Sequence, residues 1–123
     1  MEYQKKFDIH DRIFHFVIRV LRFIKVLPKT FENKALLDQL IRSATSMGAN
    51  DQEADGVSSK RDFIHCYTIV RKEAKETMYW IRLVSEMNEM LKPRTVALLQ
   101  ENHELISIVS SILKNAKKSD VIS

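Results

Sequence analysis

Apolar residues along the chain recur mostly at steps of three and four positions, and no stretch alternates apolar and polar residues between turn signals. The first pattern indicates amphipathic helices, whereas alternation would indicate strands. The 123 residues include only two glycines and two prolines, which favours long helices and few tight turns. The pattern therefore predicts an all-α protein with helices over about residues 11–27, 31–54, 60–91 and 94–117.

The expected helix ends carry residues that stop or cap helices. Pro28 should stop the first helix, and Pro93 should open the fourth. Gly56 follows the second, where a left-handed residue would suit. Ser59 and Asp62 resemble a capping box at the start of the third. With connections this short, we expect one domain spanning the chain, folded as an antiparallel up-down-up-down four-helix bundle.

Small and polar side chains interrupt the middle of the second predicted helix. An apolar stripe should face the core, and a second, polar stripe lies roughly opposite. That stripe could simply face solvent, but serine is a poor choice for an exposed helix face because its hydroxyl competes for backbone groups. We therefore favour a second contact face, within the bundle or between subunits. The stripe comprises Gln39, Arg42, Ser43, Ser46, Asn50 and Glu53.

Glu73 lies inside the wide apolar arc of the third predicted helix. A lone ionised carboxylate is costly to bury, so it needs a partner. We predict a structural polar contact between Arg42 and either Glu73 or Glu76. The alternatives are unrelated surface charges or a catalytic carboxylate.

The net charge of +4 is distributed unevenly along the chain. Residues 1–30 hold seven Lys and Arg against three acids, and residues 31–57 hold two against five. The basic stripe of the first helix could follow a phosphate backbone, or it could be an ordinary solvated face. No aromatic residue interleaves it, which favours backbone contact over base stacking. The predicted nucleic-acid-binding residues are Arg12, Arg19, Arg22 and Lys25, with Lys29, Arg71, Lys75 and Arg82 as secondary candidates.

The sequence lacks the usual motifs of catalytic and metal sites. No two of its four histidines have four-residue helical spacing, and no Glu-x-x-His pair or glycine-rich phosphate loop occurs. His65 and Cys66 are adjacent, so on a helix their side chains would point apart. We therefore expect no enzyme activity, no metal and no cofactor.

The chain also shows no sign of export or membrane insertion. Its single cysteine, Cys66, cannot form an internal disulfide, which fits a reducing compartment. Residues 1–6 lack the apolar core of a signal peptide, and no apolar run approaches the roughly 20 residues of a membrane span. We therefore expect a cytoplasmic protein with no membrane partner.

The segment Leu36 to Val84 carries a recognisable order of motifs. It resembles the four-helix-bundle proteins encoded within intervening sequences of bacterial 23S ribosomal RNA genes, a group labelled a ribosomal protein family. It is also similar to the accessory variability proteins of diversity-generating retroelements. The motifs are Gln39-x-x-Arg42-Ser43 with Ser46 and Asn50, then Lys60 to Phe63, then Lys72-Glu73-Ala74-x-Glu76-Thr77 with Tyr79-Trp80.

The chain departs from these relatives just after Asn50. Family members commonly have an apolar or aromatic residue there, whereas this chain has Asp51. Family members also have a Glu-Gly soon afterwards, whereas here Glu53 is followed by Ala54-Asp55-Gly56.

The resemblance implies a bundle that assembles into a ring-like homo-oligomer, a pentamer, although two-fold dimers are commoner among oligomers in general. It also implies that a basic central surface could bind RNA or DNA. We therefore predict a non-enzymatic, homo-oligomeric protein that binds nucleic-acid backbone. The alternative is a protein-interaction scaffold or accessory subunit for a nucleic-acid enzyme such as a reverse transcriptase, with a ribosomal component as a further candidate partner.

Overall fold

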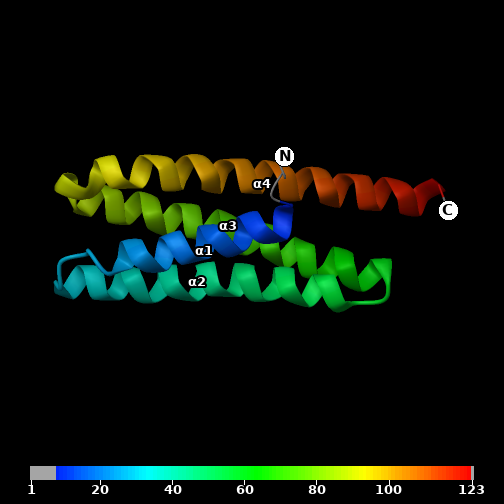
Figure 1. Ribbon diagram of the computed structural model, residues 1–123, viewed down its shortest axis with the longest axis horizontal. Helices are drawn as coiled ribbons and strands as arrows, with labels where there is room; N and C mark the ends of the chain where they lie inside the picture. The colour runs from blue at the N-terminus through cyan, green and yellow to red at the C-terminus, as the bar shows by residue number, and fades with distance from the viewer. Residues whose placement is uncertain (1–7, 123) are drawn as a thin grey trace, which may run out of the picture.

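The computed structural model describes the backbone of residues 8–122 and the side chains of residues 8–118. Residues 1–6, which carry the expectation about a signal peptide, lie outside this part. Each helix packs against the next along the chain, and the first also packs against the last (Figure 1). The predicted all-α, up-down four-helix bundle is therefore confirmed. Its elements are α1 (Ile9–Ile24), α2 (Phe31–Gly56), α3 (Lys60–Met87), the short 3-10 helix η1 (Glu89–Leu91) and α4 (Lys92–Ile122).

Helix α1 is the shortest of the four, with 16 residues against 26 to 31 in the others. It covers only the part of the bundle where α2 and α4 begin (Figure 1). The helix ends at Ile24, not at Leu27 as predicted. The reason is a tightened turn before Pro28, in which the N–H groups of Val26 and Leu27 donate to carbonyls three residues back, at 3.0 and 3.2 Å.

The chain breaks between the third and fourth helices at Asn88, earlier than the sequence predicts. Asn88 leaves the helical conformation with φ −136° and ψ 73°. Its amide exchanges two hydrogen bonds of 2.9 Å with the buried amide of Asn33, at the start of α2. Pro93 lies in the first turn of α4, where its missing N–H costs nothing.

The connection between α2 and α3 corrects one prediction and confirms another. Gly56 is the last residue of α2 and has no left-handed backbone, so the prediction of a left-handed cap was wrong. The helix ends instead because Val57 turns extended, with φ −80° and ψ 153°. The Oγ of Ser59 accepts a hydrogen bond of 3.0 Å from the backbone N–H of Asp62, as the capping pattern predicts.

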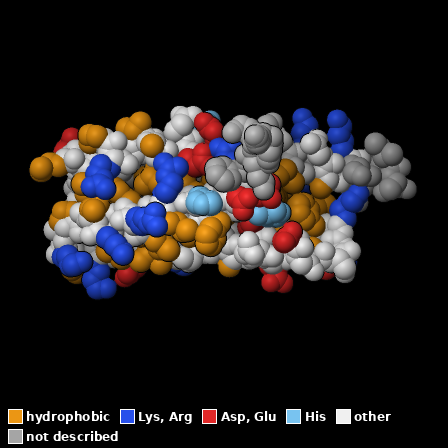
Figure 2. All heavy atoms as spheres, in the orientation of Figure 1, with side chains coloured by type: hydrophobic (Ala, Val, Ile, Leu, Met, Phe, Trp, Pro, Cys, Tyr) orange, Lys and Arg blue, Asp and Glu red, His pale blue; other side chains and the backbone are white. Residues whose placement is uncertain are grey.

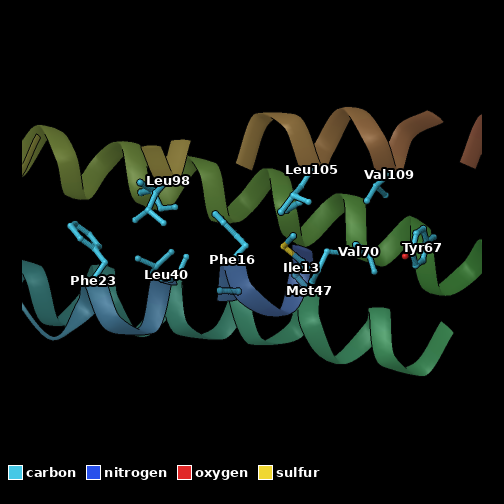
Figure 3. Close-up of a cluster of buried hydrophobic side chains, with 14 of the residues drawn as sticks. Ile13, Phe16, Phe23, Leu40, Met47, Tyr67, Val70, Leu98, Leu105 and Val109 are labelled. Atoms are coloured by element: carbon cyan, nitrogen blue, oxygen red, sulfur yellow. The ribbon is translucent and has the colours of Figure 1, made fainter. Parts of the chain in front are cut away.

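All four helices contribute large apolar side chains to one core (Figure 3). Burying each such side chain contributes about 1.5–3 kcal/mol. The side chains labelled in Figure 3 point into the space between the helices. They are Ile13, Phe16, Phe23, Leu40, Met47, Tyr67, Val70, Leu98, Leu105 and Val109.

The small residues of α2 allow two neighbours to approach it closely. On one flank, Ser43 is fully buried and its Oγ accepts a hydrogen bond of 2.9 Å from the hydroxyl of Thr77 in α3. On another flank, a Cβ added to Gly48 would lie 3.3 Å from a methyl group of Val17 in α1. Of the predicted polar stripe, Ser43 is buried against α3 and Ser46 and Asn50 are partly buried. The rest of the stripe, Gln39, Arg42 and Glu53, is exposed, so the contact with α3 covers only part of the predicted face.

Candidate nucleic-acid interface

Arg12, the first of the predicted nucleic-acid-binding residues, is engaged inside the bundle. Its guanidinium binds both carboxylate oxygens of Glu101 in α4, at 2.6 and 3.1 Å, and an oxygen of Glu104 at 2.9 Å. The hydrogen bond to Glu101 is the main cause that raises the pKa of Arg12. Because its donors already face two carboxylates, this geometry does not favour phosphate contact by Arg12.

Arg19, Arg22 and Lys25 are exposed on the remaining part of α1 and its end. Within residues 8–118, no ion pair involves any of the three. The chain has no acidic residue between Asp11 and Glu32 that could offset them locally. Figure 2 shows lysine and arginine side chains gathered over the C-terminal half of α1 and the start of α4. The structure therefore leaves a basic surface on this side of the bundle.

Arg94 belongs to the same surface and was missed by the sequence analysis. Arg19, Arg22 and Arg94 line one hollow between α1 and α4, together with the buried side chains of Phe23 and Leu98. An up-down topology places the start of the fourth helix beside the end of the first, so the predicted topology itself contained a signal for Arg94. A second signal was a positive charge in the first turn of a helix, where the helix dipole disfavours it.

The structure brings together Arg42, Glu73 and Glu76 across α2 and α3. The guanidinium lies 3.3 Å from Glu73 and 2.5 Å from Glu76. The Oγ of Ser46 also donates to Glu73, at 3.2 Å. The Glu73 side chain is only 9% exposed, so it needs these partners. The hydrogen bond to Glu76 is the main cause that raises the pKa of Arg42.

Asp51 is buried and joins three helices. It accepts a hydrogen bond of 2.6 Å from the hydroxyl of Tyr67 in α3, and lies 2.9 Å from Nδ1 of His10 in α1. Burial and the hydrogen bond to Asp51 raise the pKa of Tyr67. An Asp–His pair also orients the base of hydrolase triads. Here, however, the second ring nitrogen of His10 lies 3.6 Å from the Asp55 carboxylate, so both nitrogens face acids.

The described residues offer little for metal or thiol chemistry. Among them, no group of three or more His, Cys, Asp or Glu side chains is placed to hold a metal ion. Cys66 is buried, and burial raises the pKa of its thiol, which disfavours the reactive thiolate. None of the helices in this part of the chain has the length and apolar character needed to cross a membrane.

Comparison with known proteins places the chain in a family. The model of the 23S rRNA-intervening sequence protein family matches residues 5–111. A solved structure from Bacteroides thetaiotaomicron, described as a protein of unknown function from the S23 ribosomal protein family, superposes with a TM-score of 0.78. The two sequences are 30% identical, over 86% of this chain and 98% of the other. A search of curated proteins finds no match. The chain is therefore a member of the 23S rRNA-intervening sequence protein family.

Proposed function

We propose that this protein is a non-enzymatic, homo-oligomeric bundle that binds the backbone of RNA or DNA through its basic surface. We define this surface by Arg19, Arg22, Lys25 and Arg94. The observation that carries the proposal is the clustering of Arg19, Arg22 and Arg94 around one hollow between α1 and α4. Within residues 8–118, no ion pair engages these arginines or Lys25. Other cations of the bundle, such as Arg12 and Arg42, bind carboxylates.

Binding by such a surface would be driven by electrostatics. Lysine and arginine that neutralise phosphates release counterions, so affinity falls as salt rises. Phe23, the aromatic residue that lines the hollow beside these cations, is buried, so the described lining offers no exposed ring for stacking on bases. We therefore expect binding that depends strongly on salt and weakly on base sequence.

Self-association is the second part of the proposal, with another copy of this chain as the partner. A hollow between α1 and α2 is lined by apolar and small residues, among them Phe14, Val17, Gly48 and Ala49. Phe14 is 58% exposed, and Leu21, further along α1, is 38% exposed. Covering such side chains with a second copy would remove them from water. A ring of copies would also repeat the basic surface, which strengthens binding to a long polymer.

The proposed assembly is tested by measuring mass in solution with light scattering. The substitution Phe14→Glu should convert the oligomer to monomer, because it places a charge in the proposed contact. The matched control is Val96→Glu on α4, where an apolar side chain is also exposed, at 65%. A monomeric wild-type protein, or an oligomer that both substitutions leave intact, would contradict this part of the proposal.

Nucleic-acid binding is tested by retardation of RNA and duplex DNA at moderate salt. Replacing Arg19, Arg22 and Lys25 together by glutamate should abolish retardation while the helical content stays unchanged. The control carries the same change of charge elsewhere, at the exposed residues Arg61, Lys72 and Lys114. Equal loss in both variants, or affinity that does not respond to salt, would contradict the proposed mechanism.

One observation favours the alternative of an accessory subunit for a nucleic-acid enzyme. Phe31 and Met90 are 91% and 93% exposed. Both lie at the end of the bundle where α2 and α4 begin (Figure 1). Large exposed apolar side chains are typical of contact sites for other proteins. A wild-type protein that oligomerises but retards neither RNA nor DNA would support this alternative.

A further inference from the structure

We propose that the hollow between α1 and α4 is a site for a single phosphoryl group, held by Arg19, Arg22 and Arg94. The inference deepens the proposed function and rests on it, because it names one anchoring point on the nucleic-acid backbone. It also gives α4 a direct part in binding, which no sequence motif indicated.

Cations beside the hollow are paired with carboxylates, unlike those that line it. Lys92 lies two residues before Arg94, and its ammonium group lies 3.3 Å from Glu86 and 3.2 Å from Glu89. Arg12 precedes Arg19 on α1 and binds two carboxylates of α4. Within the part of the chain that the structure describes, Arg19, Arg22 and Arg94 have no acidic partner. Arg12 and Lys92 are therefore paired with carboxylates, whereas the three arginines that line the hollow are not.

The three unpaired arginines around the hollow carry an electrostatic cost when no anion is bound. Three like charges around one hollow repel each other, and Arg94 also lies in the first turn of α4, at the positive end of the helix dipole. A bound anion would reverse both effects, because it attracts the three guanidinium groups and suits a helix N-terminus. The site is thus electrostatically unfavourable when empty and favourable when it holds an anion.

The donors and apolar side chains that line the hollow indicate which kind of anion it would bind. A guanidinium group presents planar pairs of N–H donors that match the oxygens of a phosphate. The buried side chains of Phe23 and Leu98 also line the hollow, and an apolar wall strengthens charge interactions beside it. A terminal phosphate carries nearly two negative charges and balances more of the three positive charges than a carboxylate or an internal diester, each of which carries one. On charge, a terminal phosphate therefore fits better than the carboxylate of an acidic peptide.

The phosphoryl group can come from two sources on a nucleic acid, an internal diester or a terminal 5′-phosphate. The experiment compares Arg94→Gln with the wild-type protein, using single-stranded RNA of one sequence with either a 5′-hydroxyl or a 5′-phosphate. Arg61→Gln is the matched control, because Arg61 is exposed, has no ion pair within residues 8–118, and lies at the opposite end of the bundle (Figure 1). Circular dichroism checks that the variants keep their helices.

We expect Arg94→Gln to weaken binding by about tenfold and to lower the slope of log affinity against log salt by about 0.7, the value for one phosphate contact on a single strand. Arg61→Gln should change affinity by less than about twofold. If the 5′-phosphate strengthens binding to wild-type protein but not to Arg94→Gln, the source is the strand end. If the two strands bind equally and Arg94→Gln still weakens both, the source is an internal diester. Either result supports the site.

Other outcomes separate failure of the site from failure of the proposed function. If Arg94→Gln binds as tightly as Arg61→Gln, the site is wrong while nucleic-acid binding stands. If wild-type protein binds neither strand, inorganic pyrophosphate is the remaining probe. A rise in thermal midpoint with pyrophosphate that Arg94→Gln abolishes would keep the site and reject the function; no rise would reject both. Equally tight binding of poly-glutamate would overturn the preference for phosphate.

Discussion

Arg12 and Arg19 lie on the same helix about two turns apart, yet their charged surroundings in the bundle differ. Arg12 binds Glu101 and Glu104, whereas Arg19 lines a hollow with Arg22 of the same helix and Arg94 of α4. Arg42 resembles Arg12 in this respect, because at the contact between α2 and α3 it forms ion pairs with Glu73 and Glu76. The comparison shows that charge pairing between helices, and not charge itself, separates cations that stabilise this fold from cations that remain available to a ligand.

The largest effect should come from the buried carboxylate of Asp51, the most enclosed of the paired charges. Asp51→Ala removes the acceptor for the Tyr67 hydroxyl and leaves that hydroxyl buried without a partner. We expect a loss of about 3 kcal/mol in the free energy of unfolding, measured by urea denaturation. Asp51→Asn keeps an acceptor oxygen and should cost less than half as much. Equal losses in the two variants would show that shape, and not hydrogen bonding, matters there.

The same pair should make stability depend on alkaline pH. The pKa of Tyr67 is raised above its usual value of 10. The neutral phenol therefore contributes stability that is fully present below pH 10 and is lost as pH rises above it. Between pH 10 and 11.5 we expect wild-type protein to lose about 2 kcal/mol more than Tyr67→Phe, since one pH unit corresponds to about 1.4 kcal/mol. Parallel pH profiles for the two proteins would contradict this.

The contact of Arg42 with Glu73 should have the next largest effect. Arg42→Ala leaves a carboxylate that is 9% exposed with Ser46 as its one remaining hydrogen-bond donor among the described residues, and we expect a loss of about 1–2 kcal/mol. Exchanging the two residues, Arg42→Glu with Glu73→Arg, should recover part of the loss that either reversal causes alone. A double-mutant cycle measures this coupling. An exchange no more stable than its single variants would remove the structural role of the pair.

The smallest expected effect on stability comes from replacing the paired Arg12 or the unpaired Arg19 and Arg94. Arg12→Gln should lose about 1 kcal/mol in the free energy of unfolding, because it gives up a bidentate contact that is partly screened by solvent. Arg19→Gln and Arg94→Gln should change stability by less than about 0.5 kcal/mol, or raise it slightly, because each removes a like-charge repulsion. Thermal unfolding at low salt checks all three variants. Equal losses would mean that the contrast between paired and unpaired arginines has no energetic basis.

Much of the fold follows from the sequence, since local features decide it. Helical spacing and Pro28 predicted the number, order and approximate ends of the helices. Two errors are local, at the turn before Pro28 and at Gly56, whereas the error at the end of α3 depends on a distant partner. Asn88 ends α3 through its amide contacts with Asn33, which is 55 residues away. Neither asparagine carries a sign of its partner in the sequence.

The candidate site was only partly predictable, for a similar reason. Periodicity placed Arg12 and Arg19 on one polar stripe, and a single helix offers no basis for telling them apart. Likewise, Asp51 stood out in the sequence only as a departure from its relatives, and its contact with Tyr67 emerged from the packing of α2 against α3.

By itself, the sequence determined an all-α bundle of four antiparallel helices, because hydrophobic periodicity and helix breakers act over a few residues. Only the tertiary structure decided which charges are paired. It placed Glu101 opposite Arg12 and Arg94 opposite Arg19, because those pairings depend on how α4 lies against α1. Coulomb interactions extend between helices that are distant in sequence, so a surface available to a ligand is a property of the folded bundle.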